Sequence, residues 1–264
     1  MTSHDRGSTS LDGGEEPRSS PSRETPPRKR KHLPLWQETV LLLAVALVLA
    51  VVIKTFFVQA FYIPSASMEP GLVLNDRILI QKVSYWGDAG PERGDVVVFK
   101  DPGGWLGAKD AAPPNPMAKV LTKIGLYPTG GHLVKRVIGV AGDTVTCCDE
   151  QGRLMINGEP LDGSEFLKPG ASCDGPMAYQ CQKDWEVGPI PEGHLFVMGD
   201  NRANSSDSSA RMCRPDKETD CVPGKEFVPV DLVVGRVFVL LWPADRFSWT
   251  QRPDAFEDIP DPAP

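Results

Sequence analysis

The sequence predicts a mainly β fold, in which one N-terminal membrane-spanning helix precedes an antiparallel β-sheet domain. Between Thr39 and Ile53 the chain is apolar without interruption. Beyond this run, short segments rich in Val, Ile and Phe recur between Gly, Pro and Asp residues, which is typical of antiparallel sheets. The 264 residues, 41% of them hydrophobic, suffice for one domain of ordinary size with appendages.

Residues 1–34 are rich in Ser, Pro, Gly and charge, so they cannot bury a core and are expected to form a disordered tail. Phe56, Phe57 and Val58 extend the apolar run past Lys54 to the ~20 residues that a bilayer requires. The sequence therefore predicts a transmembrane helix at 35–59, with Lys54 reaching towards the outer interface.

The orientation follows from the basic run at 28–31, which directly precedes the span. The positive-inside rule places the tail in the cytoplasm and the residues after about 60 outside. The expected location is the cell membrane, as a single-pass type II protein. A cleavable secretory signal is the alternative, but the large residues Phe61, Tyr62 and Ile63 stand where such a signal would carry small ones.

The net charge of -7 argues against a nucleic-acid partner, since phosphate binding needs a concentrated basic face.

All six cysteines follow the span and so lie on its proposed outer side, where disulfides persist. Cys173 with Cys181, and Cys213 with Cys221, are attractive local pairs, although spacing cannot fix the connectivity. Zinc is the alternative, but no Cys-x-x-Cys pair or nearby His supports it, so no metal or cofactor is expected. The remaining cysteines are Cys147 and Cys148.

The β domain is expected to cover 60–245, with a C-terminal tail at 246–264. Asn157-Gly158 is a strong hairpin-turn signal. The expected strands are Arg77–Val83, Asp95–Lys100, Leu133–Val140, Thr144–Cys147, Arg153–Ile156, Leu195–Met198 and Val233–Leu241.

Two insertions interrupt this domain, at 101–132 and 161–187. In the first, the apolar residues Met117, Val120, Leu121 and Ile124 recur at helical spacing, so a short amphipathic helix is expected. It would pack on the domain or contact anionic headgroups. The second insertion carries two cysteines and is expected to form a looped subdomain.

A candidate nucleophile lies in the segment 63–70, a Pro-bounded turn with two serines, Ser65 and Ser67, shortly after the span. A serine attacks a carbonyl only if a base removes its proton. None of the four histidines lies within a recognisable triad motif, so lysine is the leading candidate for the base.

Lys135 is the favoured base, because it lies in the probable central strand Leu133–Val140. Side chains of a strand alternate between its faces, so Lys135 shares a face with Leu133 and Val137. Burial beside them would lower the pKa of the amine, as a general base at neutral pH requires. Taken singly, a Pro-Ser turn is usually only a turn, and a Lys-Arg pair on a strand usually lies at a solvated edge or in an ion pair.

A third element is the polar loop 198–208, which follows an apolar strand. Such loops often position active-site groups. On its own this loop is equally consistent with a calcium-like or purely structural turn.

Together these segments resemble the type I signal peptidase family, membrane-anchored serine peptidases with a Ser/Lys dyad. The long insertion after Lys100 and the six cysteines suggest an actinobacterial-type branch of that family. The resemblance covers about 36–242. Its motifs occur in family order at Tyr62–Pro70, at Arg93–Lys100, at Lys135–Gly139 with Gly142-Asp143, and at Gly199–Arg202 with Asp207-Ser208.

The resemblance implies that Ser67 is the nucleophile, Lys135 the general base, and Ser205 the residue that orients Lys135. It also implies an oxyanion hole formed by the Ser67 backbone N–H and the Ser65 hydroxyl. Shallow pockets for small residues would be lined by Phe61, Ile63, Leu72 and Val134. Structural support is expected from Arg136, Asp200 and Asp207.

At two positions where the family's last motif usually carries a charged residue, this chain has Ala203 and Ser209. The usual ion pair of Asp207 with an arginine is therefore in doubt; Arg211 is a candidate substitute, and Asp200 a candidate partner for Arg136.

The implied activity is cleavage of exported preproteins after small-x-small sequences. The implied partners are signal peptides, the lipid bilayer and, as a further candidate, the secretion translocon. Two alternatives remain: the same chemistry on a narrow set of surface proteins, and an inactive anchored β domain.

Overall fold

The computed structural model describes residues 34–85, 87, 89–106, 131–169, 185–213 and 222–262. The chain divides into two compact units, Met1–Val45 and Ala46–Pro264. Helix α1 (Leu35–Val52) is, among the described residues, the one helix long and apolar enough to cross a membrane. It buries none of its side chains against protein, as expected of a helix that is apolar on all faces.

A π-helical turn (Ile53–Phe57) follows α1, and strand β1 then begins at Val58. The expected span of 35–59 is therefore longer than the helix itself. Val58 and Gln59 pair with β2 instead of extending the helix.

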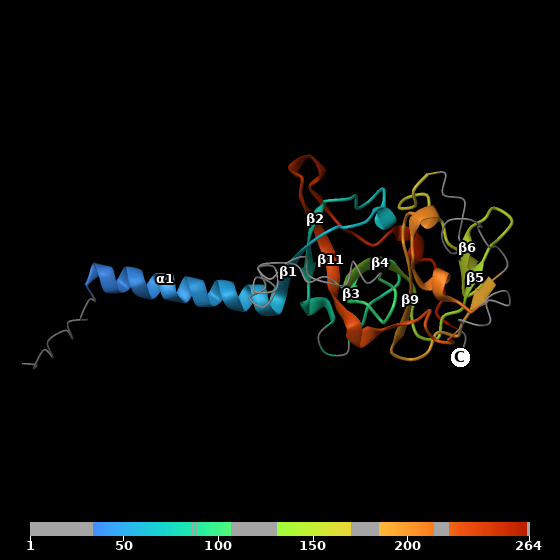
Figure 1. The fold of residues 1–264 in the computed structure, drawn as a ribbon, viewed down its shortest axis with the longest axis horizontal. Coiled ribbons are helices and arrows are strands. Elements are labelled where there is room, and N and C mark those ends of the chain that lie inside the picture. Colours follow the sequence, from blue (N-terminus) through green and yellow to red (C-terminus); the bar gives the residue numbers. More distant parts are fainter. Residues whose placement is uncertain are drawn as a thin grey trace, which may run out of the picture. The chain divides into compact units, whose positions relative to one another are not determined.

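Over the described residues the larger sheet has eight strands, all paired antiparallel, and β3 lies at its middle between β11 and β4 (Figure 1). Its strands in spatial order are β1 (Val58–Tyr62), β2 (Arg77–Gln81), β11 (Val233–Trp242), β3 (Val96–Lys100), β4 (His132–Gly139), β9 (His194–Met198) and β10 (Val228–Pro229), with β12 (Ser248–Trp249) paired to β11.

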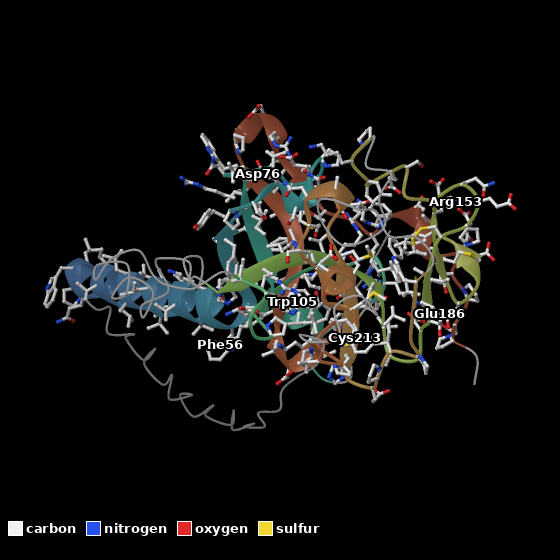
Figure 2. All side chains as sticks on the ribbon, turned by 45° about the vertical axis from the view of Figure 1, so that its right-hand side comes forward. Phe56, Asp76, Trp105, Arg153, Glu186 and Cys213 are labelled. Atoms are coloured by element: carbon white, nitrogen blue, oxygen red, sulfur yellow. A yellow bond between two sulfur atoms is a disulfide. The ribbon has the colours of Figure 1, made fainter. Side chains whose placement is uncertain are left out.

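A smaller sheet, with four strands among the described residues, lies on the β9 side of the larger one (Figure 1). In spatial order it comprises β7 (Glu159–Pro160), β6 (Leu154–Ile156), β5 (Val145–Cys147) and β8 (Trp185–Val187). Arg153 and Glu186 mark its position in Figure 2. Ile138 and Phe196 of the larger sheet share an apolar cluster with Val145 and Ile156 of the smaller one, and this cluster joins the two sheets.

Short helical turns connect the strands. They are η2 (Ala66–Met68), η3 (Val83–Tyr85), η4 (Arg202–Asn204), η5 (Ser208–Arg211), η7 (Val230–Leu232), η8 (Ala244–Arg246) and η9 (Asp254–Phe256).

The central strands of the larger sheet are buried on both faces. In β3, Val96 and Val98 contribute to one apolar cluster, and Val97 and Phe99 to another. Such near-continuous burial explains why β3 reads as an unbroken apolar run in the sequence.

Each of the strands expected from the sequence is present, with ends that differ by one or two residues. The Asn157-Gly158 turn joins β6 to β7, and both residues have positive φ, 53° and 86°. Strands β1, β7, β8, β10 and β12 were not expected.

The expected tail at 246–264 is, over its described residues, part of the domain. Strand β12 pairs with β11, and Phe256 and Ile259 are buried in the cluster that joins the two sheets. Arg252 also binds the buried carboxylate of Asp95. The apolar residues of this segment explain why it packs on the sheets.

The predicted helix of the first insertion lies outside the described residues, as do Cys173, Cys181 and Cys221. Cys147 and Cys148 form a disulfide, and Cys213 is also disulfide-bonded. The second insertion is described at both ends. One end supplies β8, and the other packs against the candidate site.

Candidate active site

Ser67 lies in the turn η2, shortly after β1. The turn is closed by hydrogen bonds from Glu69 N to Ala66 O and from Leu72 N to Met68 O. Met68 is almost fully buried in an apolar cluster, which anchors the turn that carries the buried Ser67.

The Nζ atom of Lys135 donates a hydrogen bond to the Oγ atom of Ser67 over 2.6 Å. Lys135 comes from β4, and its side chain is only 4% exposed. Burial lowers the pKa of this amine from 10.5 to about 8, while the negative charges of Asp207 and Asp200 act in the opposite direction. At slightly alkaline pH a large fraction of the amine is therefore neutral and can accept a proton.

The pairing of the strands explains the burial of Lys135. It stands opposite Val97 of β3, between Leu133 and Val137, all of which are buried. The pairing of β4 with β9 ends at Arg136 and Met198. Beyond Met198 the chain leaves the sheet as the polar loop that the sequence singled out.

This loop holds the nucleophile turn, which is η2 with Ser67 at its centre. A Cβ atom added at Gly199 would overlap the carbonyl oxygen of Ser67 and the side chain of Ser205, so only glycine permits this approach. Asn201 donates from its backbone N–H to Ser67 O and from its Nδ2 atom to Ala66 O, each over 3.0 Å. Sequence reasoning did not single out Asn201, although it lies within the last family motif.

The Ser65 hydroxyl lies 3.2 Å from the Ser67 hydroxyl, and Ser65 is exposed. It is therefore accessible to a substrate beside the nucleophile. Ser205 is buried, and its Oγ atom has no hydrogen-bond partner among the described residues. The contact with Lys135 that the family resemblance implies is thus absent from the hydrogen bonds of this structure.

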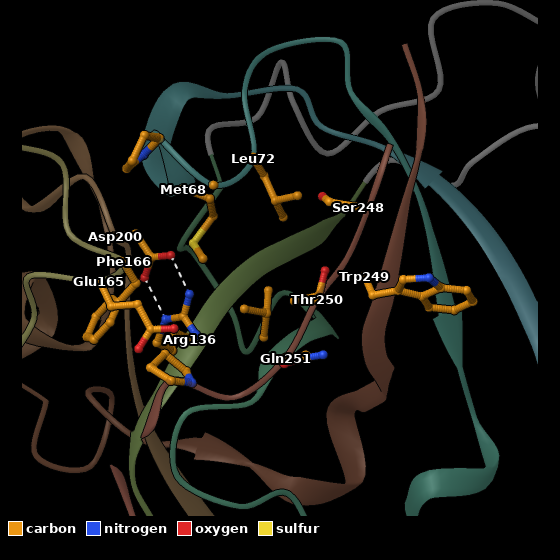
Figure 3. A pocket seen from close by; sticks show the side chains of 14 residues that line it. Met68, Leu72, Arg136, Glu165, Phe166, Asp200, Ser248, Trp249, Thr250 and Gln251 are labelled. Carbon is orange, nitrogen blue, oxygen red and sulfur yellow. Dashed lines mark hydrogen bonds and ion pairs between the residues drawn. The ribbon is translucent and has the colours of Figure 1, made fainter. Parts of the chain in front are cut away.

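Arg136 and Asp200 form a buried two-pronged ion pair, with N–O distances of 2.8 and 2.7 Å (Figure 3). Arg136 also donates to the carbonyl oxygen of Gly94 over 2.9 Å. The pair connects the lysine strand to the loop after β9 and to the turn before β3.

Asp207 is buried and accepts hydrogen bonds from Gly199 N at 2.9 Å and from the Ser209 hydroxyl at 2.7 Å. Arg211 does not replace the usual arginine partner within the described chain. It donates to Trp105 O and to the Ser206 hydroxyl instead. Ser209, which departs from the family motif, is itself the new partner of Asp207.

The four residues expected to line substrate pockets belong to a single apolar cluster with Met68: Phe61, Ile63, Leu72 and Val134. Leu72 and Met68 also border a cavity of about 320 Å³, whose wall includes Arg136, Asp200 and the segment 248–251 (Figure 3). The structure thus gathers all the residues named for the site around Ser67, the strand of Lys135 and the loop after β9.

The family model "Signal peptidase, peptidase S26" matches residues 36–242. The chain belongs to this family. "Signal peptidase I" of Mycobacterium tuberculosis is 38% identical over 238 residues, 85% of this chain and 78% of that protein. "Probable signal peptidase I" of Mycobacterium leprae is 35% identical over 84% of this chain and 80% of its own length. "Signal peptidase I" of Leptolyngbya laminosa is 31% identical over 90% of this chain and 97% of its own length.

A solved structure of a signal peptidase I from Enterococcus faecalis V583 is 21% identical over 55% of this chain and 95% of its own, with a TM-score of 0.27, which is too distant for structural argument.

The expected fold class is confirmed, since the chain is mainly antiparallel β with one N-terminal apolar helix. The chain is a signal peptide-cleaving serine peptidase, and the family does not favour an inactive β domain. The helix and the family indicate a membrane-anchored protein.

Proposed function

We propose that this chain removes N-terminal signal peptides from exported preproteins by cutting after small-x-small sequences, with Ser67 as nucleophile and Lys135 as general base. The observation that carries the proposal is the 2.6 Å hydrogen bond between Lys135 Nζ and Ser67 Oγ, in a site that lowers the pKa of the amine. A serine hydroxyl next to a buried amine is the arrangement that covalent acyl transfer requires.

In the first step, neutral Lys135 takes the hydroxyl proton as Ser67 Oγ attacks the scissile carbonyl carbon. The oxyanion that forms would accept hydrogen bonds from the Ser67 backbone N–H and the Ser65 hydroxyl, each worth ~3 kcal/mol in the transition state. Lys135 then gives its proton to the leaving amine, and the acyl-enzyme forms. Water, activated by the same amine, hydrolyses that ester and releases the signal peptide.

The position of Gly199 and the bonds of Asn201 support a role for the loop in holding the nucleophile turn. We propose that Ser205 orients Lys135 in the substrate complex, where catalytic hydrogen bonds often tighten. The burial of its unpartnered hydroxyl supports this role, since an unsatisfied buried group is costly to keep.

The specificity for small residues is attributed to the bulk around the site. Phe61, Ile63 and Val134 are large, buried and packed together, so they leave shallow space beside the nucleophile turn. A small side chain such as alanine would fit there, whereas a larger one would require the cluster to repack.

The proposed topology has the tail in the cytoplasm, α1 across the bilayer and the peptidase domain outside. The basic run at 28–31 supports this orientation. The disulfide of Cys147 and Cys148 is also consistent with an oxidising compartment. The proposed partners are signal peptides, the bilayer and the secretion translocon.

The test uses the full chain in detergent with a preprotein that carries an Ala-x-Ala site. Ser67→Ala and Lys135→Ala should each abolish cleavage while the fold is retained, as judged by circular dichroism. The exposed residues Ser164 and Lys100 provide matched controls, and their alanine variants should cleave normally. Undiminished cleavage by either site variant would reject the assignment.

A further inference from the structure

The beginning of the second insertion contacts the segments that surround the Ser67–Lys135 pair. The sequence predicts a looped subdomain at 161–187, an insertion within the β domain, and Phe166 of this insertion is buried against Arg136, with its ring centroid 4.5 Å from the guanidinium carbon. Two residues later, Lys168 donates its backbone N–H to Asp200 O over 3.1 Å, and its Nζ atom lies 2.7 Å from Glu69 Oε2.

Each of these contacts ends on a segment that carries or holds a catalytic group. Arg136 directly follows Lys135 in β4, and Glu69 lies two residues after Ser67. Asp200 belongs to the loop that binds the nucleophile turn through its neighbour, Asn201. Phe166 and Lys168 therefore contact all three segments that meet at the Ser67–Lys135 pair.

Phe166 also shields the ion pair between Arg136 and Asp200. Its ring lies next to the guanidinium of Arg136 in the close view of the site (Figure 3), and Phe256 packs against the ring at 5.7 Å between ring centroids. Exclusion of water strengthens an ion pair and its hydrogen bonds, and so fixes the relative position of the segments that carry them. Cation–π contact with the ring adds attraction of its own.

We propose that Phe166 and Lys168 are positioning residues, which hold β4 and the nucleophile turn at the separation that lets Lys135 reach Ser67. This inference rests on the proposed dyad. It gives the insertion a role in the reaction, acting through Arg136, Asp200 and Glu69 and without contact to substrate.

The first test replaces the ring. In the full chain, Phe166→Leu should lower kcat fivefold or more and slow acylation of Ser67 by a small serine-directed inhibitor to the same extent, with KM within twofold. Phe166→Trp, which keeps an aromatic face, should recover kcat to within twofold. Phe227→Leu is the matched control, because Phe227 packs on the same apolar cluster and its ring contacts His194.

A purely structural role makes a different prediction for Phe166→Leu: the melting temperature falls, but kcat per folded molecule stays at the wild-type value. That result would overturn the inference. Ser67→Ala is assayed in parallel. If Ser67→Ala is inactive while Phe166→Leu is fully active, this inference fails alone; if Ser67→Ala cleaves normally, the dyad itself fails.

The second test uses the charges and does not depend on how Phe166→Leu folds. Glu69→Lys and Lys168→Glu should each lower kcat two- to fivefold, a modest change because both side chains are partly exposed. The double variant, with the charges exchanged, should regain at least half of the wild-type kcat. Lys225→Glu, at an exposed lysine elsewhere, is the control. A double variant no better than the product of the two single losses would contradict the positioning role.

Discussion

Replacing Lys135 by methionine should abolish cleavage and yet stabilise the folded protein at neutral pH. Burial lowers the pKa of the amine from 10.5 to about 8. Since one pH unit corresponds to ~1.4 kcal/mol, keeping the buried ammonium charged costs about 3 kcal/mol below pH 8. Methionine removes this cost and forfeits the hydrogen bond to Ser67, worth about 1 kcal/mol. The expected net gain in the free energy of unfolding is about 2 kcal/mol.

The sign of this effect depends on pH. Below pH 8 lysine is charged in both the folded and the unfolded chain, so the full penalty is present. Between pH 8 and 10.5 the folded protein already holds a neutral amine while the unfolded chain still binds a proton, and the penalty shrinks. The advantage of the methionine variant should therefore disappear, and then reverse by the lost hydrogen bond, as the pH approaches 10.5.

The assay is denaturant unfolding of the full chain in detergent at pH 6, 8 and 10, with the wild type and Lys135→Met measured side by side. Lys100→Met, at an exposed lysine, should show no such pH-dependent difference. A Lys135→Met variant that is less stable than the wild type at pH 6, or a difference that does not change with pH, would refute the reasoning.

Three further predictions concern the frame around the dyad. Gly199→Ala should lower kcat at least 100-fold, because the added methyl group overlaps the nucleophile's carbonyl oxygen, whereas Gly90→Ala, which meets no neighbour, should be active. Asp200→Asn should lower the free energy of unfolding by about 3 kcal/mol, since it leaves the buried Arg136 without a countercharge; a change below about 1 kcal/mol in a denaturant titration would count against that ion pair. Ser65→Ala should reduce kcat about 100-fold at constant KM, and equal cleavage rates would remove Ser65 from the oxyanion hole.

The sequence was a good guide to the strands that are apolar over several residues. Strands β3 and β4 read clearly, because burial on both faces requires unbroken apolar runs. Strand β1 was missed because its apolar start continues the membrane-length run, and β10 and β12 because two residues are too short for any period to be visible. The C-terminal segment was assigned to a tail because its few buried residues, Phe256 and Ile259, are separated by charged ones.

The pairing of Ser67 with Lys135 could be anticipated because the alternation along β4 predicts a buried amine, and because the family resemblance selects Ser67 from the two serines of its turn. The contacts of Phe166 and Lys168 could not. They join positions that are far apart in sequence, and the pairing of Lys168 with Glu69 leaves no local pattern. Likewise, nothing near Ser209 indicates that its hydroxyl binds Asp207 where an arginine is usual.

The central claim, that the buried amine of Lys135 activates Ser67, is tested most directly by the pH dependence of Ser67 acylation. The rate of labelling by a small serine-directed inhibitor should rise with pH through an apparent pKa of about 8 in the wild type, with the label on the peptide that contains Ser67. In Lys135→Met the labelling should be lost at every pH. Labelling of Ser67 at the wild-type rate in that variant would contradict the account.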